Sequence, residues 1–137
     1  MHFDAAAYGE AVARILALDG DALRILAYRG PLEQEGTLSL RLPLQTVLID
    51  RTVIERQAPV IVPDTRGEAP IERLFQDSAG EALTTTYAYI RSWIGLPLIA
   101  KGQVIGMLTL EHTTPNTYRE EHARTAMAFA NQAAVSI

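Results

Sequence analysis

The chain has 137 residues, of which 48% are hydrophobic and 20% charged, and it carries a formal net charge of −4. This length fits one domain with a sizeable core. No apolar run approaches the ~20 residues that cross a bilayer. Charges of both signs are interleaved along the chain, which argues against nucleic acid as a partner. The absence of cysteine excludes disulfides, thiolate catalysis, zinc–cysteine sites and thioether-linked chromophores. We expect a cytoplasmic domain without membrane contact, since the start also lacks a secretion signal.

The first half of the chain predicts four strands and a helix. Apolar segments on both sides of Asp19-Gly20 indicate a hairpin, because glycine readily adopts the left-handed conformation that a tight turn needs. Further along, alternation with period two precedes Pro43 and helical spacing follows it. The expected elements are strands at 12–18, 22–28, 38–42 and 60–62 and a helix at 44–57 that ends before Pro59.

Residues 64–90 form the least regular stretch. Only 70–75 suggests a helical turn or two, and three threonines follow further along. Segments of this kind, when they lie over a sheet, often supply ligand-contacting loops.

The segment 92–112 contains two apolar strand patterns joined through Lys101-Gly102. Because a long side chain tolerates a positive φ poorly, we expect a three-residue loop over 100–102 with only Gly102 left-handed. In that register Trp93 lies opposite Thr109, Gly95 opposite Met107, and Arg91 opposite Glu111. One face then carries Arg91, Trp93, Gly95, Pro97, Ile105, Met107, Thr109 and Glu111. The other carries Ser92, Ile94, Leu96, Leu98, Val104, Gly106, Leu108, Leu110 and His112.

These two faces differ in chemistry. The first mixes charged groups, an indole, a glycine gap and a thioether, which is typical of a pocket wall. The second is mainly aliphatic and suits packing against helices. A hairpin that is apolar on both faces belongs in the interior of a three-layer domain.

The last segment predicts a helix. Thr117 and Glu120 match a capping box, and an apolar stripe made mostly of alanine follows at offsets of three and four. The stripe consists of Ala123, Ala126, Met127, Ala130, Ala133, Ala134 and Ile137. One side of this helix is expected in the core, and its margin offers a dimer contact. The pattern reaches Ile137 without a stop signal, so we expect the domain to be excised from a longer protein.

Taken together, these motifs resemble the GAF domain family of bacterial signalling sensors over nearly the whole chain, 1–137. The most specific parts are residues 92–98, residues 102–110 and the helix opened by Tyr118, Glu120, Glu121 and His122; Pro63-Asp64 and the Asp19-Gly20 hairpin also fit. The resemblance implies an α+β fold with a central antiparallel sheet of about six strands. Terminal helices cover one face, and an irregular or helical pocket-forming segment covers the other.

The chain departs from the family pattern in two places. About a dozen residues precede the first strand, where the family usually has a long helix, and Arg119 stands where Ser or Thr often precedes the Glu-Glu-His stretch. The Asn-Lys…Phe…Asp-Glu signature of cyclic-nucleotide binders is missing. Covalent bilin attachment and cysteine-dependent methionine sulfoxide reduction are excluded by the missing thiol, and the cofactor is otherwise undetermined.

Each candidate site residue has a functional and a structural interpretation. Arg91 and Glu111 form either a clamp for a polar ligand or a pair worth roughly 0–1 kcal/mol. Trp93 stacks on a ligand or packs in the core, and Asp64 contacts a ligand or forms a turn. The candidate ligand-binding residues are Arg91, Trp93, Met107, Thr109, Glu111, Asp64, Tyr87 and Tyr89.

Metal binding and catalysis have little support in the sequence. His112 and His122 lack metal-ligand spacing, so no metal is expected, and a haem-ligand role for His112 competes with an ordinary structural one. No Gly-x-Ser-x-Gly elbow, phosphate-binding loop or His-Glu-x-x-His motif occurs.

The sequence therefore favours a non-enzymatic sensor. An unidentified small molecule would order 64–90 and shift the terminal helices toward an output domain such as a histidine kinase or nucleotide cyclase. Homodimerisation through those helices is expected. The alternative is a structural dimerisation module whose pocket is filled by its own side chains.

Overall fold

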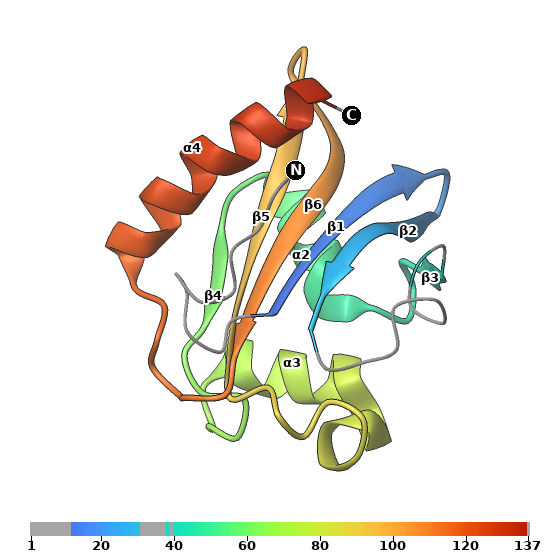
Figure 1. Ribbon diagram of the computed structural model, residues 1–137. Helices are drawn as coiled ribbons and strands as arrows, with labels where there is room; N and C mark the ends of the chain where they lie inside the picture. The colour runs from blue at the N-terminus through green and yellow to red at the C-terminus, as the bar shows by residue number, and fades with distance from the viewer. Residues whose placement is uncertain (1–11, 31–37, 39, 137) are drawn as a thin grey trace.

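A six-stranded antiparallel sheet organises residues 12–30, 38 and 40–136, which the computed structural model describes (Figure 1). Its order is β3-β2-β1-β6-β5-β4. The strands are β1 Val12–Asp19, β2 Ala22–Arg29, β3 Arg41–Pro43, β4 Val60–Val62, β5 Ser92–Ala100 and β6 Gln103–His112. The helices are α2 Leu48–Arg56, α3 Pro70–Ala79, the 3₁₀ helix η1 Gly80–Thr84 and α4 Glu120–Ser136. The predicted α+β architecture is confirmed.

The sheet is covered on both faces, as the apolar hairpin predicted. Figure 1 shows α4 along one face, α2 on the other and α3 beneath the end of the sheet. Aliphatic side chains of β5 and β6, among them Ile94, Leu96 and Leu108, pack against the buried alanines of α4. The opposite face packs against α2 and α3 and contains the larger core cluster. Residues 1–11, where the family usually has a long helix, and Ser39 of the predicted third strand lie outside the described residues.

The β5–β6 turn differs from the prediction. It has two residues, and both Lys101 (φ 53°) and Gly102 (φ 76°) are left-handed. The three-residue loop was therefore wrong: a turn with two positive φ values matches the twist of the strands, and this advantage outweighs the local cost at lysine. A register shift between Leu98 and Ile99 also leaves Ile105 outside the pairing.

These two differences together move the register by two residues. Trp93 pairs with Glu111, and Gly95 pairs with Thr109. Because side chains alternate with period two, an even displacement leaves nearly every side chain on its predicted face. Ile105 is the exception, since it packs with the cluster under α4.

Element boundaries in the less regular regions also moved. The predicted helix at 44–57 begins only at Leu48, because the N–H groups of Thr46 and Val47 turn back to the carbonyl of Pro43. The predicted helical turn at 70–75 is a ten-residue helix, α3. The third strand is limited to Arg41–Pro43.

Trp93 is buried on the face of the sheet that packs against α2 and α3. Its indole lies over Gly95, where a Cβ would come within 2.4 Å of an indole ring carbon, so the glycine makes room for the ring. The Phe75 ring of α3 packs at a tilt, 5.8 Å away between centroids. The core interpretation of Trp93 is thus confirmed, and its position also places it beside a cavity.

Among the described helices, none has both the length and the apolar character that a bilayer span requires.

Candidate functional site

A cavity of about 200 Å³ lies between the sheet and the α2–α3 layer. Five strands (β1, β2, β3, β5 and β6) and the helices α2 and α3 contribute to its lining, together with residues that precede β5. Its lining consists of Arg14, Leu16, Ile25, Leu42, Val47, Ile49, Asp50, Phe75, Ser78, Ala79, Tyr87, Ile90, Trp93, Thr109 and Glu111. We call this space the sheet cavity.

Arg14 is the central charge of the sheet cavity. On β1 it pairs with Tyr28 of β2 on one side and Thr109 of β6 on the other, so period-two alternation aims its side chain at the cavity. Its guanidinium makes an ion pair with the buried carboxylate of Glu111. The same guanidinium lies over the rings of Tyr28 and Tyr87, at 5.2 and 5.5 Å from their centroids.

Tyr89 completes the surroundings of the ion pair. Its hydroxyl donates to Glu111 Oε2 at 2.9 Å and accepts from Arg14 Nη2 at 3.4 Å. Burial raises the pKa of Tyr89 to about 12, with Arg14 acting in the opposite direction, so the phenol remains a donor at neutral pH. Glu111 is thereby contacted at both carboxylate oxygens, as a buried charge requires.

Thr109 provides a polar group that the protein itself does not use. The residue is 3% exposed and lines the sheet cavity. Its Oγ1 has no hydrogen-bond partner among the described residues. An unpartnered buried hydroxyl is costly to the fold and marks a position where a guest molecule could bind.

Asp50 is the second such group. It lies on α2 between Ile49 and Val53, which are both buried, and its carboxyl borders the sheet cavity. It forms no hydrogen bond or ion pair with another described residue. Burial raises the pKa of Asp50 to about 7, and the nearby positive charge of Arg14 limits the rise.

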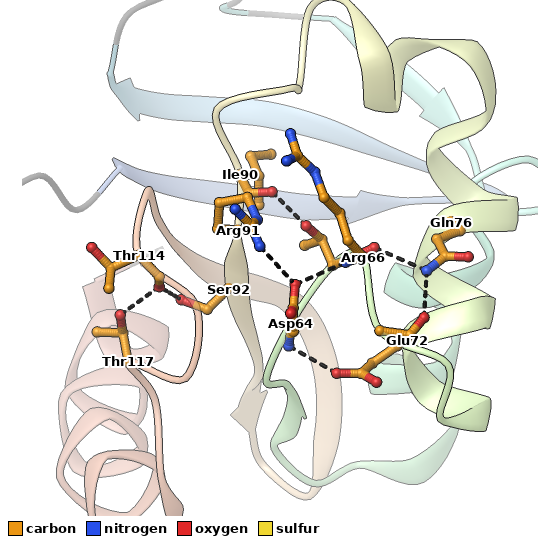
Figure 2. A network of polar contacts seen from close by, with 11 residues as sticks. Asp64, Arg66, Glu72, Gln76, Ile90, Arg91, Ser92, Thr114 and Thr117 are labelled. Carbon is orange, nitrogen blue, oxygen red and sulfur yellow. Dashed lines mark hydrogen bonds and ion pairs between the residues drawn. The ribbon is translucent and has the colours of Figure 1, made fainter.

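The predicted Arg91–Glu111 pair is not formed. Arg91 precedes β5 and turns to Asp64, with Nη2 3.3 Å from Oδ1 (Figure 2). Glu111 pairs with Arg14 instead, because the two-residue register shift places Trp93 opposite it. Asp64 also accepts the N–H of Arg66 at 3.0 Å, which is the predicted turn-forming role. That bond, more than Arg91, lowers the pKa of Asp64.

The Asp64 loop is fastened to α3 by two side chains. The Glu72 carboxylate accepts the N–H of Asp64 at 2.9 Å and that of Ala69 at 3.1 Å. The Gln76 amide donates to the carbonyls of Thr65 and Gly67 (Figure 2). These bonds join α3, which forms part of the cavity wall, to the end of β4.

The same loop is fastened to the segment that leads into α4. The N–H of Asn116 donates to the Pro63 carbonyl at 2.7 Å, and the Ser92 hydroxyl donates to the Thr114 carbonyl at 2.8 Å. We call the bonds in 63–76, 90–92 and 112–117 the loop network; Figure 2 shows most of it. It links the cavity wall to the start of α4.

The start of α4 is capped differently from the prediction. The Thr117 hydroxyl donates to the Thr114 carbonyl, so it does not cap the helix. Instead, His122 Nδ1 accepts the N–H of Arg119 at 2.9 Å, and the Arg119 carbonyl accepts the N–H of Ala123. The Thr117–Glu120 capping box was therefore wrong, because the histidine two residues after Glu120 reaches back in its place.

The structure sorts the candidate residues into three groups. Trp93, Thr109, Glu111 and Tyr87 line the sheet cavity, and Tyr89 reaches its ion pair. Met107 is fully buried in the adjoining core. Arg91 and Asp64 belong to the loop network.

Sequence reasoning missed Arg14 and Asp50. Arg14 interrupts an apolar strand at an inward position, in step with Val12 and Leu16. Asp50 falls three residues before Val53 on the apolar side of its helix. A charge in phase with buried residues was the available signal in both cases.

A larger and mainly apolar groove of about 440 Å³ lies on the α4 side of the sheet. It is lined by Ile94, Leu108, Leu110, Tyr118, His122, Thr125, Ala126, Ala128, Phe129 and Gln132. The Tyr118 hydroxyl is buried there without a partner among the described residues, and burial raises its pKa. We place the candidate site in the sheet cavity because the charged groups gather there. His112 has a structural role, since its Nδ1 accepts the N–H of Thr114.

Comparisons with known proteins identify the family. Residues 6–137 match the GAF domain family. The chain belongs to this family. No curated protein sequence matches it.

Three solved structures show the same fold at low identity. A methyl-accepting chemotaxis protein (residues 122 to 287) has a TM-score of 0.75 at 18% identity over 96% of this chain and 80% of its own. A domain of a putative two-component sensor histidine kinase from Sinorhizobium meliloti 1021 has a TM-score of 0.61 at 21% identity, and the match covers 91% of this chain and 76% of that one. A free methionine-R-sulfoxide reductase from Neisseria meningitidis, solved in complex with its substrate, has a TM-score of 0.68 at 21% identity. The match covers 92% of this chain and 66% of that one.

Among the described residues, no three His, Asp or Glu side chains gather closely enough to hold a metal ion.

The unpartnered Thr109 hydroxyl predicts opposite effects of the same substitution at two buried threonines. Thr109→Val should leave the free energy of unfolding unchanged or raise it by about 1 kcal/mol, because it removes an unsatisfied group. Thr65→Val should lower it by about 1–2 kcal/mol, since the Thr65 hydroxyl donates to the Ile90 carbonyl at 2.7 Å. Urea denaturation measures both. Equal losses in the two variants would show that Thr109 is satisfied in solution.

The raised pKa of Asp50 predicts a stability change with a defined sign. The folded protein holds the Asp50 proton more tightly than the unfolded chain, so this group makes stability fall as pH rises from about 4 to about 7. Asp50→Asn should remove that fall. One pKa unit corresponds to about 1.4 kcal/mol of stability, and partial exposure of the carboxyl reduces the effect. We therefore expect Asp50→Asn to raise the free energy of unfolding by about 2 kcal/mol at pH 8 and to leave it unchanged near pH 4.

Urea denaturation at both pH values measures this difference. Asp77→Asn, on an exposed position of α3, controls for the change in net charge. An equal gain in the two variants at pH 8, or a loss on Asp50→Asn, would contradict the assignment.

Proposed function

We propose that the chain is a non-catalytic, small-molecule-sensing regulatory domain of a signal-transduction protein. One observation carries the proposal: a cavity inside the domain holds a neutralised ion pair together with polar groups that have no hydrogen-bond partner among the described residues. The buried Thr109 hydroxyl and the half-buried Asp50 carboxyl at the cavity wall supply these groups. A domain with a purely structural role has no use for buried polar groups without partners, which weaken the fold.

The size of the sheet cavity limits the ligand. Sites for drug-sized molecules usually measure about 300–1,000 Å³, whereas this cavity measures about 200 Å³. A compact metabolite fits it better than a nucleotide or a tetrapyrrole. Apolar neighbours such as Leu16, Ile25 and Phe75 would hold the body of such a ligand.

The relatives support a sensory role. The similar folds come from a chemotaxis protein and from a sensor histidine kinase, while the reductase was solved with its substrate bound. An output domain of the histidine kinase or nucleotide cyclase type would suit the domain, in a cytoplasmic protein. The reductase does not transfer its chemistry here in a thiol-dependent form, because this chain contains no cysteine.

The loop network provides a route for the signal. Ala79 and Phe75 of α3 line the sheet cavity, and Glu72 and Gln76 of the same helix hold the Asp64 loop. That loop in turn is bonded to the segment before α4 through Asn116. A ligand that moved α3 would therefore displace the start of α4, and α4 would pass the shift to a homodimer partner and an output domain.

A second candidate is a structural dimerisation module that binds no small molecule. The apolar groove beside α4 favours it, together with Phe129 and Val135 on α4, which are 40% and 86% exposed. Sedimentation of the protein without any added compound discriminates the two, because a purely structural module dimerises unaided and gains no stability from small molecules.

The sensor proposal predicts that some small metabolite stabilises the protein by filling the sheet cavity. A thermal-shift screen of amino acids, amines, short carboxylic acids and nucleotides should yield a compound that raises stability by about 2.7 kcal/mol at 100 times its Kd. Trp93 is the chain's single tryptophan and lines the cavity, so its fluorescence should change with the same Kd.

Matched variants make the screen decisive. Ala79→Leu places extra carbons in the sheet cavity and should abolish the stabilisation. Ala128→Leu makes the same change on exposed α4 and should preserve it. Equal stabilisation of both variants would place the ligand elsewhere, and a flat screen with unaided dimerisation would favour the structural module.

A further inference from the structure

We propose that the sheet cavity selects a small primary amine, whose ammonium group is held between the Asp50 carboxylate and the Thr109 hydroxyl. This inference deepens the proposed function and rests on it. It specifies which polar groups face the guest and which chemistry they accept.

The positive charge of Arg14 in the sheet cavity is already paired within the protein. Arg14 is ion-paired with Glu111, donates toward the Tyr89 hydroxyl at 3.4 Å, and lies between the rings of Tyr28 and Tyr87. A guanidinium with these contacts has little left to offer a ligand carboxylate or phosphate. The cavity is therefore poorly suited to an anion, although it contains an arginine.

The charge balance points the same way. Arg14 from β1 contributes one positive charge, while Glu111 from β6 and Asp50 from α2 contribute two carboxyl groups. Among the described residues, Tyr28 of β2 and Tyr87 and Tyr89 from the segment before β5 are the remaining titratable groups beside them. An ammonium would neutralise the second carboxylate, whereas an anionic ligand would add a third negative charge to a space of low polarity.

The Thr109 hydroxyl would orient the ammonium group of the ligand. Its Oγ1 is buried and has no hydrogen-bond partner in the part of the chain that the structure describes, and the residue pairs with Arg14 in the sheet register. A hydroxyl oxygen accepts a hydrogen bond from an N–H donor, and an ammonium has three donors to share between it and the carboxylate of Asp50. Neither group has to give up a hydrogen bond to another described residue in order to bind the amine.

The rest of the lining defines the body of the ligand. Leu16, Ile25, Phe75, Ile90 and Trp93 are apolar and surround the polar end of the cavity. Together with the volume of about 200 Å³, they suit a short hydrocarbon chain or a single aromatic ring. The expected ligand is thus a compact amine with one apolar substituent.

Binding should release a proton below neutral pH. The pKa of Asp50 is about 7 in the free protein, so near pH 6 the group is mostly the neutral acid. An arriving alkylammonium stays protonated and favours the carboxylate, and the proton of Asp50 passes to the buffer. Affinity should therefore rise with pH up to about 7 and level off above it.

The test uses two probe sets whose members share a body and differ at the polar end. The aromatic set is 2-phenylethylamine, 2-phenylethanol and phenylacetate, and the linear set is butylamine, butanol and butyrate, all at constant ionic strength and pH 8. Trp93 fluorescence and calorimetry report binding. We expect at least one amine to bind about tenfold or more tightly than its alcohol, and the acids to bind more weakly than the alcohols.

Asp50→Asn should weaken the amine about tenfold or more and leave the alcohol unchanged, while Asp77→Asn should change neither. For the wild-type protein, the affinity for the amine should fall about tenfold between pH 7 and pH 6 or slightly below, with proton release visible as a difference in heat between two buffers. Asp50→Asn should bind without that pH dependence.

Three results would overturn the inference: tighter binding of an acid than of its amine, unchanged affinity for the amine in Asp50→Asn, or no binding of either amine. The outcome for the proposed function is separate. If another compound of the metabolite screen stabilises the wild-type protein and not Ala79→Leu, the sensor function stands while the amine specificity fails.

Discussion

The buried carboxylate of Glu111 is the constraint that shapes this domain. A charge at the centre of a sheet requires compensation, and here Arg14 of the neighbouring strand and the Tyr89 hydroxyl provide it. Three polar side chains at one place prevent the face of the sheet above them from closing into a hydrocarbon core. On the opposite face, aliphatic side chains and alanines pack against α4, and the groove that remains beside this helix is mainly apolar.

A cavity bordered by this ion pair has a definite electrostatic character. Because the arginine and the glutamate neutralise each other, the groups that remain for a guest include the Thr109 hydroxyl and the Asp50 carboxyl. Both weaken the fold when nothing binds to them. Under the proposed function, their presence among residues such as Leu16 and Phe75 is stability given up for recognition, which is a common feature of functional sites.

The position of α3 connects this cavity to the rest of the domain. One side of the helix borders the cavity through Phe75 and Ala79, while Glu72 and Gln76 bind the backbone of the Asp64 loop. That loop is bonded to the segment preceding α4. Hydrogen bonds therefore join the helix that would respond to a ligand to the segment that leads into the helix that would transmit the response.

Much of this arrangement follows from local sequence patterns, and some of it does not. Period-two alternation placed Trp93, Thr109 and Glu111 on one face even though the register was wrong by two residues, because an even shift preserves the faces. The Arg91–Glu111 pair failed for the same reason, since a specific partner depends on the register. The phase of Arg14 with Val12 and Leu16 could have marked it as an inward charge. Its partner Glu111 could not be predicted in the same way, because that pair forms only when β1 pairs with β6, and such long-range pairing leaves no mark within a short window of sequence.

The most direct test of the central claim, that the sheet cavity is a ligand site, is a crystal structure of the protein grown with 2-phenylethylamine. The account predicts ordered density for the compound between α2, α3 and the sheet, with its nitrogen within hydrogen-bond distance of Asp50 and Thr109. A structure in which Trp93 and Phe75 close the space and the compound is absent, or lies against Arg14 and away from Asp50, would contradict it.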